Sequence, residues 1–211
     1  MAAHHDAVRA GVESSLAKES TLLSAAKAPE HIEVRALAPE GDTDVWTLFT
    51  VGVSDISKMS AAETWVRAEL CLRIPAEDAP TLEVVERTYG WAIDRMVELG
   101  ARPFDLGFGY AAGDTIPNGD PPKPFTEHTE QCCWLLLPPT VVEEHFISTA
   151  LGPVALLALA AIDAAEMKLK LNKSTLALCE RLGMNERATR LDPHRPSVVS
   201  GRSFLSKILG R

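Results

Sequence analysis

The chain has 211 residues, of which 46% are hydrophobic and 24% charged, as is typical of a soluble globular protein with one substantial core. Its formal net charge of −8 argues against non-specific nucleic-acid binding, which needs a basic surface to displace the counterions of phosphates. An acidic surface instead favours a basic protein partner, and the length favours a single domain.

The first part of the chain predicts one helix followed by two strands. Apolar residues recur at helical spacing in residues 6–28, which indicates an amphipathic helix that packs on a sheet and ends at Pro29. Strict alternation over residues 31–37 predicts a half-buried strand. Aromatic and β-branched residues predict a second strand over residues 46–53. The polar segment 54–64 is expected to be an irregular loop.

Residues 66–74 also alternate, so they predict a strand with two different faces. One face carries the apolar residues Val66, Ala68, Leu70, Leu72 and Ile74. The other carries Arg67, Glu69, Cys71 and Arg73, and we interpret it as a charge ladder exposed to solvent. Helical periodicity then covers residues 81–100, where Gly90 could divide the segment and Gly100 is expected to end it. Residues 104–112 are glycine-rich and expected to be extended.

Residues 113–122 contain the most strongly specified turn of the sequence. Pro117 keeps Ile116 out of the helical region, so Thr115 to Pro117 is expected to be a short extended piece. The pair Asn118-Gly119 tolerates positive φ and can reverse the chain. Three polar side chains are placed around this turn, namely Asp114, Asn118 and Asp120. Such a turn either frames a binding surface or is simply a stable loop.

The last third of the chain predicts three strands and one long helix. Strands are predicted over residues 132–137, 141–147 and 154–159, although the third is rich in Ala and Leu and could also be helical. A helix is predicted from Ala164 to Leu182, ended by Gly183, and residues 192–195 form a turn. The expected fold is therefore α+β, a layered sandwich in which helices pack on a mixed or mostly antiparallel sheet of five to seven strands.

The sequence contains none of the common catalytic or phosphate-binding motifs. Glu69 and Asp114 are the best carboxylate candidates for an acid–base pair, and the enzyme alternative is a hydrolase that uses one of them with His145 or His194. The alternative is that Glu69 pairs with a neighbouring arginine and that Asp114 accepts hydrogen bonds from the turn backbone. Glu143 and His145 would share a strand face, but no third metal ligand is indicated. We expect no catalytic residue, no cofactor and no metal.

Four cysteines occur without CxxC spacing, and adjacent Cys132 and Cys133 would point to opposite faces of a strand. Reduced thiols in a cytoplasmic protein account for this pattern, and Cys133 on an apolar strand is expected to be inert. The first residues include no apolar signal segment, and the longest apolar run, 153–162, is too short to span a bilayer. We therefore expect a cytoplasmic protein without a membrane contact.

Several motifs together resemble the suppressor-of-fused domain family, in particular its single-domain bacterial members. They are Trp46–Asp55, Arg67–Leu72, Trp91–Leu99, Thr115–Pro121, Gln131–Pro139 and Asp192–Arg195. The resemblance implies a suppressor-of-fused-like domain over residues 29–196, with an N-terminal helix at 1–28 packed on it and a tail at 197–211. Asp114 stands where the family commonly has histidine, which weakens any proposal that needs a histidine there.

The resemblance implies a binding module rather than an enzyme. Animal suppressor of fused grips an extended peptide of Gli-type transcription factors as an added strand between two domains, and this chain resembles the first domain alone. Bacterial relatives are interpreted as immunity proteins that neutralise a toxin. The implied partner is a protein or extended peptide, such as a basic toxin, and a dimerising scaffold, or homodimer, is a further alternative. The candidate partner-binding residues are Ser54, Asp55, Glu69, Asp114, Asn118 and Asp120.

Overall fold

The computed structural model describes residues 2–16, 18–23, 31–39, 44–59, 65–107, 109–138, 146–183 and 186–199. The helices within these ranges are α1 (Ala2–Leu16), α2 (Leu82–Leu106), α3 (Ala164–Asn172), α4 (Thr175–Leu182) and the 3-10 helices η1 (Val53–Asp55) and η2 (Glu186–Thr189). The strands are β1 (Thr21–Leu22), β2 (Glu33–Leu37), β3 (Val45–Val51), β4 (Ser57–Met59), β5 (Trp65–Pro75), β6 (Thr115–Pro117), β7 (Gln131–Leu137), β8 (Phe146–Thr149) and β9 (Gly152–Asp163).

All of these strands belong to one mixed sheet. Its order is β1-β2-β3-β5-β9-β7-β6, with β4 paired to β5 and β8 paired to β9. Every pairing is antiparallel except that of the two long central strands, β5 and β9, where Arg67 lies opposite Val154. The predicted α+β fold with a mixed sheet is therefore confirmed, with more strands than expected.

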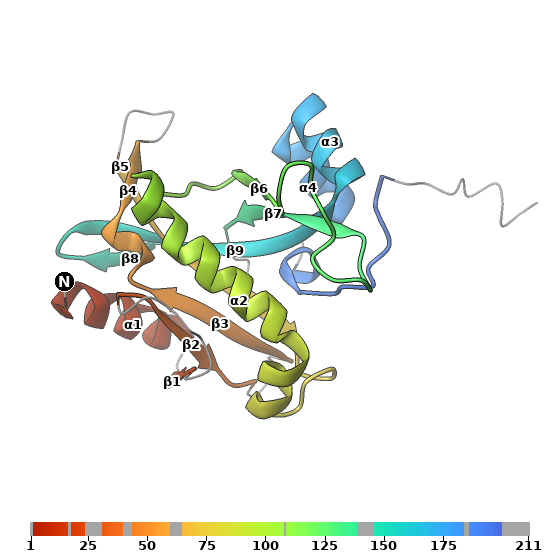
Figure 1. Cartoon of the computed structure of the whole chain (residues 1–211). Coiled ribbons are helices and arrows are strands. Elements are labelled where there is room, and N and C mark those ends of the chain that lie inside the picture. The colour runs from red at the N-terminus through yellow and green to blue at the C-terminus, as the bar shows by residue number, and fades with distance from the viewer. Residues whose placement is uncertain are drawn as a thin grey trace, which may run out of the picture.

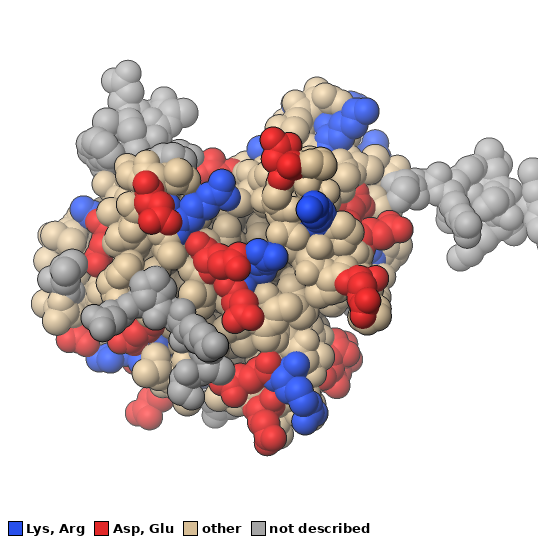
Figure 2. Space-filling view, viewed as in Figure 1, with Lys and Arg blue, Asp and Glu red and all other residues tan. Residues whose placement is uncertain are grey.

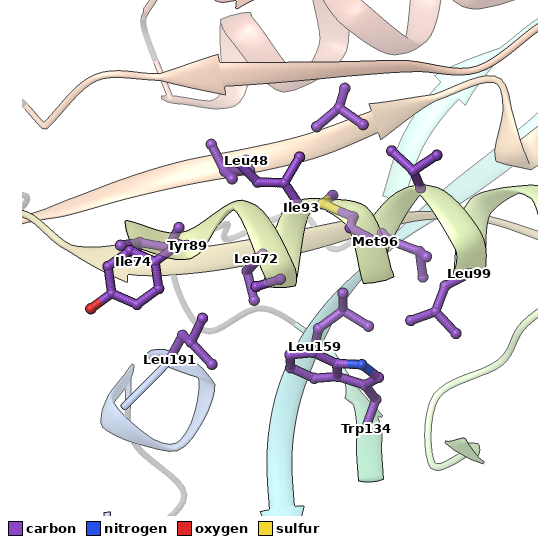
Figure 3. Close-up of a cluster of buried hydrophobic side chains, with 14 of the residues drawn as sticks. Leu48, Leu72, Ile74, Tyr89, Ile93, Met96, Leu99, Trp134, Leu159 and Leu191 are labelled. Atoms are coloured by element: carbon purple, nitrogen blue, oxygen red, sulfur yellow. The ribbon is translucent and has the colours of Figure 1, made fainter. Parts of the chain in front are cut away.

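Helices cover both faces of this sheet (Figure 1). Helix α2 crosses one face and buries the largest apolar cluster, part of which is drawn in Figure 3. On the opposite face, α1 packs over β3, β5 and β8, while α3 and α4 pack over β7 and β9. Because side chains alternate along a strand, Leu70 and Leu72 of β5 face α2, and Cys71 faces α1.

The predicted charge ladder on β5 is wrong, because its second face is not open to solvent. Glu69 and Arg73 are 0% and 1% exposed, and Cys71 is buried between them. The sequence alternates as expected, but α1 covers this face beside Cys71, and Arg73 lies against the C-terminal segment at Arg190. Both faces of the central strands are therefore core, and no described helix is long and apolar enough to cross a membrane.

Several predicted helix boundaries also differ from the structure. The N-terminal helix covers residues 2–16 rather than 6–28, and residues 21–22 form β1. Helix α2 continues past Gly100 and ends at Gly107, which has a φ of 71°. Gly100 instead permits close packing, since a Cβ there would lie 3.2 Å from Cγ2 of Val53. The backbone of α2 departs from helical geometry at Tyr89, the residue before Gly90.

The remaining differences involve segments of weak periodicity. The predicted loop 54–64 contains β4, and residues 104–106 are the last turn of α2 rather than extended. The long C-terminal helix is divided at Lys173, where Ser174 caps the start of α4 with its side chain. The predicted strand 141–147 is described only from Phe146 onward, and His145 and Glu143 lie outside the described residues.

Candidate binding surface

The loop that follows β3 is held from inside the molecule by the carboxylate of Glu69. Thr50 donates its hydroxyl proton to Oε2 over 2.6 Å, and the backbone N–H groups of Gly52 and Ser54 each donate to Oε1 over 3.0 Å. Val53 donates a longer bond of 3.3 Å to Oε2. Burial raises the pKa of the Glu69 carboxyl, and the hydrogen bonds from Ser54, Thr50 and Gly52 oppose that shift.

Helix α1 covers the outer side of the same loop. Nε2 of His4 lies 2.8 Å from the Ser54 hydroxyl, and Nε2 of His5 lies 3.0 Å from Oδ2 of Asp55. Arg67 donates to the carbonyl oxygens of both loop residues. Burial lowers the pKa of the His4 imidazole, and the smaller opposing effect of the Asp55 carboxylate does not cancel that shift. The neutral imidazole is therefore favoured at this contact between α1 and the loop.

Two of the predicted partner-binding residues are consequently internal. Ser54 and Glu69 are fully buried, and a partner on the surface cannot touch either side chain. Asp55 is also largely covered, because His5 sits against its carboxylate. The motif is therefore an internal anchor for the loop after β3. Sequence patterns contain no signal for this pairing, because α1 is separated from the loop by about fifty residues of chain.

The three polar residues around β6 lie at the surface instead. Asp114 accepts a hydrogen bond from the backbone N–H of Ala111 over 2.9 Å, as the turn-capping interpretation predicted. Asn118 donates through Nδ2 to the carbonyl oxygens of Lys123 and Pro124. Gly119 has a φ of 94°, which confirms that the turn needs a residue tolerant of positive φ, and Asp120 is exposed.

Strand β6 is the last strand in the sheet order, and no other strand of the described residues pairs with its outer edge. Its inner edge pairs with β7. There the backbone N–H of Leu136 donates to the carbonyl oxygen of Asp114, and the backbone N–H of Asn118 donates to the carbonyl oxygen of Cys132. Ile116 lies opposite Trp134 in the same register. Because backbone groups alternate along an antiparallel strand, those of Thr115 and Pro117 point away from β7.

Two small pockets lie between this strand and α2. One has a volume of about 180 Å³ and is bordered by Leu99, Arg102, Ile116 and Trp134, among others. The other, of about 260 Å³, shares Arg102 and Ile116 and extends to Tyr110. Figure 2 shows acidic and basic side chains interspersed along the α2 face rather than separated by sign.

A larger cavity of about 980 Å³ lies at the other end of α2. Its two arginines are engaged by carboxylates: Arg190 binds Asp44, and Arg195 binds Glu166 through both guanidinium NH₂ groups. The rest of its lining is mixed, with Tyr89 donating to Asp78 over 3.4 Å. Both arginines are thus engaged within the protein, and the acidic residues Glu77, Asp78 and Asp192 also line the cavity.

The candidate catalytic residues do not form a catalytic arrangement. Glu69 is sealed inside, whereas Asp114 and His194 lie at the surface in different parts of the chain. Burial raises the pKa of the Cys133 thiol to about 12, as expected for a core cysteine, and all four cysteines are free and buried. Among the described residues no group of three or more His, Cys, Asp or Glu side chains could hold a metal ion.

Comparison with known proteins relates this fold to one family. A family model for suppressor of fused protein (SUFU) matches residues 28–196, whereas no curated protein matches the sequence. A solved Sufu–Fu complex is 13% identical with a TM-score of 0.65, and the alignment covers 92% of both chains. A SUFU homologue from Neisseria gonorrhoeae is 16% identical with a TM-score of 0.60, over 94% of this chain and 98% of that one.

Drosophila Suppressor of Fused is 13% identical with a TM-score of 0.65, over 93% of this chain. The alignment covers 51% of the Drosophila chain, so the present chain spans about half of that protein. At these identities the structural similarities show the fold alone. The α1 residues that cover the loop after β3 lie outside the segment that matches the family model.

Proposed function

The chain belongs to the suppressor-of-fused family, and from this premise we propose that it is a non-catalytic module that binds an extended segment of a partner protein. One of the similar structures is a Sufu–Fu complex, which supports protein binding as the role of this fold. The partner segment would lie along β6 and extend the sheet by one strand.

The open edge of β6 is the observation that carries this proposal. Thr115 directs its N–H and C=O away from β7, and Pro117 directs a C=O in the same direction. Pro117 lacks an N–H, which is tolerated only where a strand edge needs no donor at that point. A partner strand would satisfy these groups, and the pockets beside Ile116 would accept its alternate side chains.

The polar residues around the turn form the proposed rim of this edge. Asp120 is exposed at the end of the turn, and Asn118 and Asp114 hold the backbone on either side of β6. Asp55 lies at a separate position beneath α1, where His5 covers its carboxylate, so it is not part of this rim. The net charge of −8 would speed the encounter with a basic partner. If that partner is a toxin, the chain would be a cytoplasmic immunity protein.

The hydrolase alternative is less well supported by the geometry. A general acid or base must reach substrate, and Glu69 has no exposed surface and four donors around its carboxylate. Asp114 is committed to a backbone amide of its own turn. These contacts favour binding over catalysis.

The proposal is tested by retrieving partners from a lysate of the source cell with the wild type and three variants. Thr115→Pro removes the outward N–H of β6, and Asp120→Lys reverses the charge of the rim. Asp94→Lys, on the exposed side of α2, is the matched control for charge. We expect a protein that the wild type and Asp94→Lys retain and that both β6 variants lose while staying folded.

Retention of that protein by Thr115→Pro would show that β6 is not the binding edge.

The dimerising-scaffold alternative uses the same edge, with a second copy of the chain as the added strand. It predicts a dimer for the wild type and a monomer for Thr115→Pro in analytical ultracentrifugation. A monomeric wild type that retains a partner would exclude it.

A further inference from the structure

The smaller pocket between α2 and β6 is shaped for one side chain rather than for a peptide backbone. Its apolar walls are Leu99 from α2, Ile116 from β6 and Phe125 from the loop that follows, and charged side chains of α2 complete the lining. Its volume of about 180 Å³ is that of a single large side chain rather than of a separate ligand. In an added strand on β6, alternate side chains would project toward α2 on the same face as Ile116.

The floor of this pocket contains a buried hydrogen-bond donor without an acceptor. Trp134 is 2% exposed, and its indole Nε1 has no hydrogen-bond partner among the described residues. Figure 3 shows the nitrogen edge of the ring turned toward α2. Stacking fixes this orientation, because the ring centroid lies 4.5 Å from that of Phe125 and 6.3 Å from that of Trp91. A buried donor left unsatisfied costs about 1–3 kcal/mol, so an acceptor at this point is favoured.

The charges at the mouth of the pocket determine which acceptor fits. Arg102 borders both small pockets, is exposed, and makes no hydrogen bond or ion pair within the described part of the chain. Arg95 is also at the mouth, but Glu98 on the next turn of α2 pairs with it. One arginine charge is therefore left uncompensated at this pocket. A cationic side chain is disfavoured there, and an anionic one is attracted.

We propose that this pocket receives an acidic side chain of the partner, with its carboxylate accepting the Trp134 Nε1–H and pairing with Arg102. Glutamate suits the pocket better than aspartate, because its two methylene groups would lie against the apolar walls. The inference rests on the proposed function, since the β6 edge delivers the side chain. It is compatible with a basic partner: the overall charge governs encounter, while one acidic residue fixes the register of the added strand.

The probe for this proposal is a displayed library of random nine-residue peptides, selected on the folded wild-type protein. The best peptide is then synthesised in two forms, with its acidic residue intact and with that residue changed from Glu to Gln or from Asp to Asn. Binding of both forms is measured by calorimetry to Trp134→Phe and to Arg102→Gln. Trp91→Phe, in the same aromatic stack, and Arg87→Gln, exposed on the same helix, are the matched controls.

We expect the selected peptides to share one acidic position flanked by alternating apolar residues. Trp134→Phe should weaken the acidic peptide about tenfold or more, the range for a hydrogen bond to a charged group, and should affect the amide form much less. Arg102→Gln, which is exposed and should fold normally, should also weaken the acidic form selectively. The two control variants should bind both forms as the wild type does.

Two failures are distinguishable. If peptides are enriched and Thr115→Pro abolishes their binding, but none carries an acidic position or Trp134→Phe has no selective effect, the pocket proposal is wrong and the β6 proposal stands. If no peptide is enriched on the wild type relative to Thr115→Pro, the β6 proposal itself is wrong and the pocket proposal falls with it.

Discussion

The carboxylate of Glu69 fixes the backbone of the connection between β3 and β4. It accepts three backbone N–H groups and one hydroxyl, which is the arrangement that bound anions commonly find in loops. Thr50 extends the network, because its hydroxyl oxygen also accepts the backbone N–H of Leu70 over 2.8 Å. One side chain thereby joins two strands and the loop that α1 covers.

We therefore expect Glu69→Gln to lower the free energy of unfolding by about 3 kcal/mol. Glutamine offers a single acceptor oxygen, and its NH₂ group would face the backbone donors of Gly52 and Ser54, leaving buried groups unpaired. Urea unfolding monitored by tryptophan fluorescence measures the change. Glu180→Gln, exposed on α4, should change the same quantity by less than about 0.5 kcal/mol. Equal effects of the two substitutions would refute the anchoring role of Glu69.

At the scale of residues, the roles of the turn residues could be predicted from the sequence. The burial of polar side chains by distant elements could not. The turn residues Asn118 and Gly119 and the capping role of Asp114 follow from backbone preferences of single residues. Glu69 on an alternating strand predicts a polar face, yet its partners are backbone amides supplied by another element. The sequence likewise predicts that Trp134 is an ordinary core residue. Its unpaired indole nitrogen could not be predicted, because it results from stacking with Phe125 and Trp91.

At the scale of elements, α1 is attached by two kinds of contact. Its histidines bind the loop after β3, and its apolar residues Val8 and Val12 pack with Ile147 of β8 in the second apolar cluster. Gly11 lies at the point of closest approach, because a Cβ on it would overlap Cγ2 of Ile147. The glycine in this helix is therefore explained by packing against β8.

Gly11→Ala should destabilise the docked helix even though alanine is the better helix former. The overlap with the stiff β-branched side chain of Ile147 should outweigh the intrinsic gain and lower the free energy of unfolding by about 1–3 kcal/mol. In an Ile147→Ala background the overlapping methyl group is absent, so the same substitution should instead stabilise by up to about 1 kcal/mol. A double-mutant cycle in urea measures both effects. The same sign in both backgrounds would contradict this packing account.

The order and type of most elements could be predicted because their periodicity is strong. Strands β2, β3, β5 and β7 and helix α2 follow from alternation or helical spacing. The ends of α1 and α2 could not be predicted. The chain soon after α1 pairs with β2 as a short strand, and Gly100 permits close packing of α2 against Val53 instead of ending the helix. The short strands β4 and β6 carry little signal of their own, and β6 was expected only as an extended piece between turns.

At the scale of the whole molecule, the segment that follows α4 links distant parts of the sheet. Leu191 donates its backbone N–H to Arg73 of β5 and is buried in the main core. Gln131 of β7 donates its side-chain N–H to the carbonyl oxygen of Asp192 over 2.7 Å. The segment thus spans from β5 to β7, and it ends on α3 through Arg195.

The pair between Arg195 and Glu166 closes this connection. Each guanidinium NH₂ group donates to one carboxylate oxygen over 2.7 Å, and one of them also donates to the carbonyl of Ala161 in β9. Glu166 is fully buried and caps the start of α3 together with Asp163. Its charge therefore depends on a partner that can form two parallel hydrogen bonds.

Arg195→Lys should accordingly destabilise the whole fold by about 2 kcal/mol, since an ammonium keeps the charge but cannot form the paired hydrogen bonds to buried Glu166. Arg190→Lys is the matched comparison in the same segment. Its partner Asp44 is largely exposed, so we expect a loss below about 1 kcal/mol. Urea unfolding measures both losses, and hydrogen exchange should show weaker protection in β9 and α3 for the first variant alone. If the two substitutions lower the stability equally, the Arg195 pair does not join the segment to the sheet in the way that we infer.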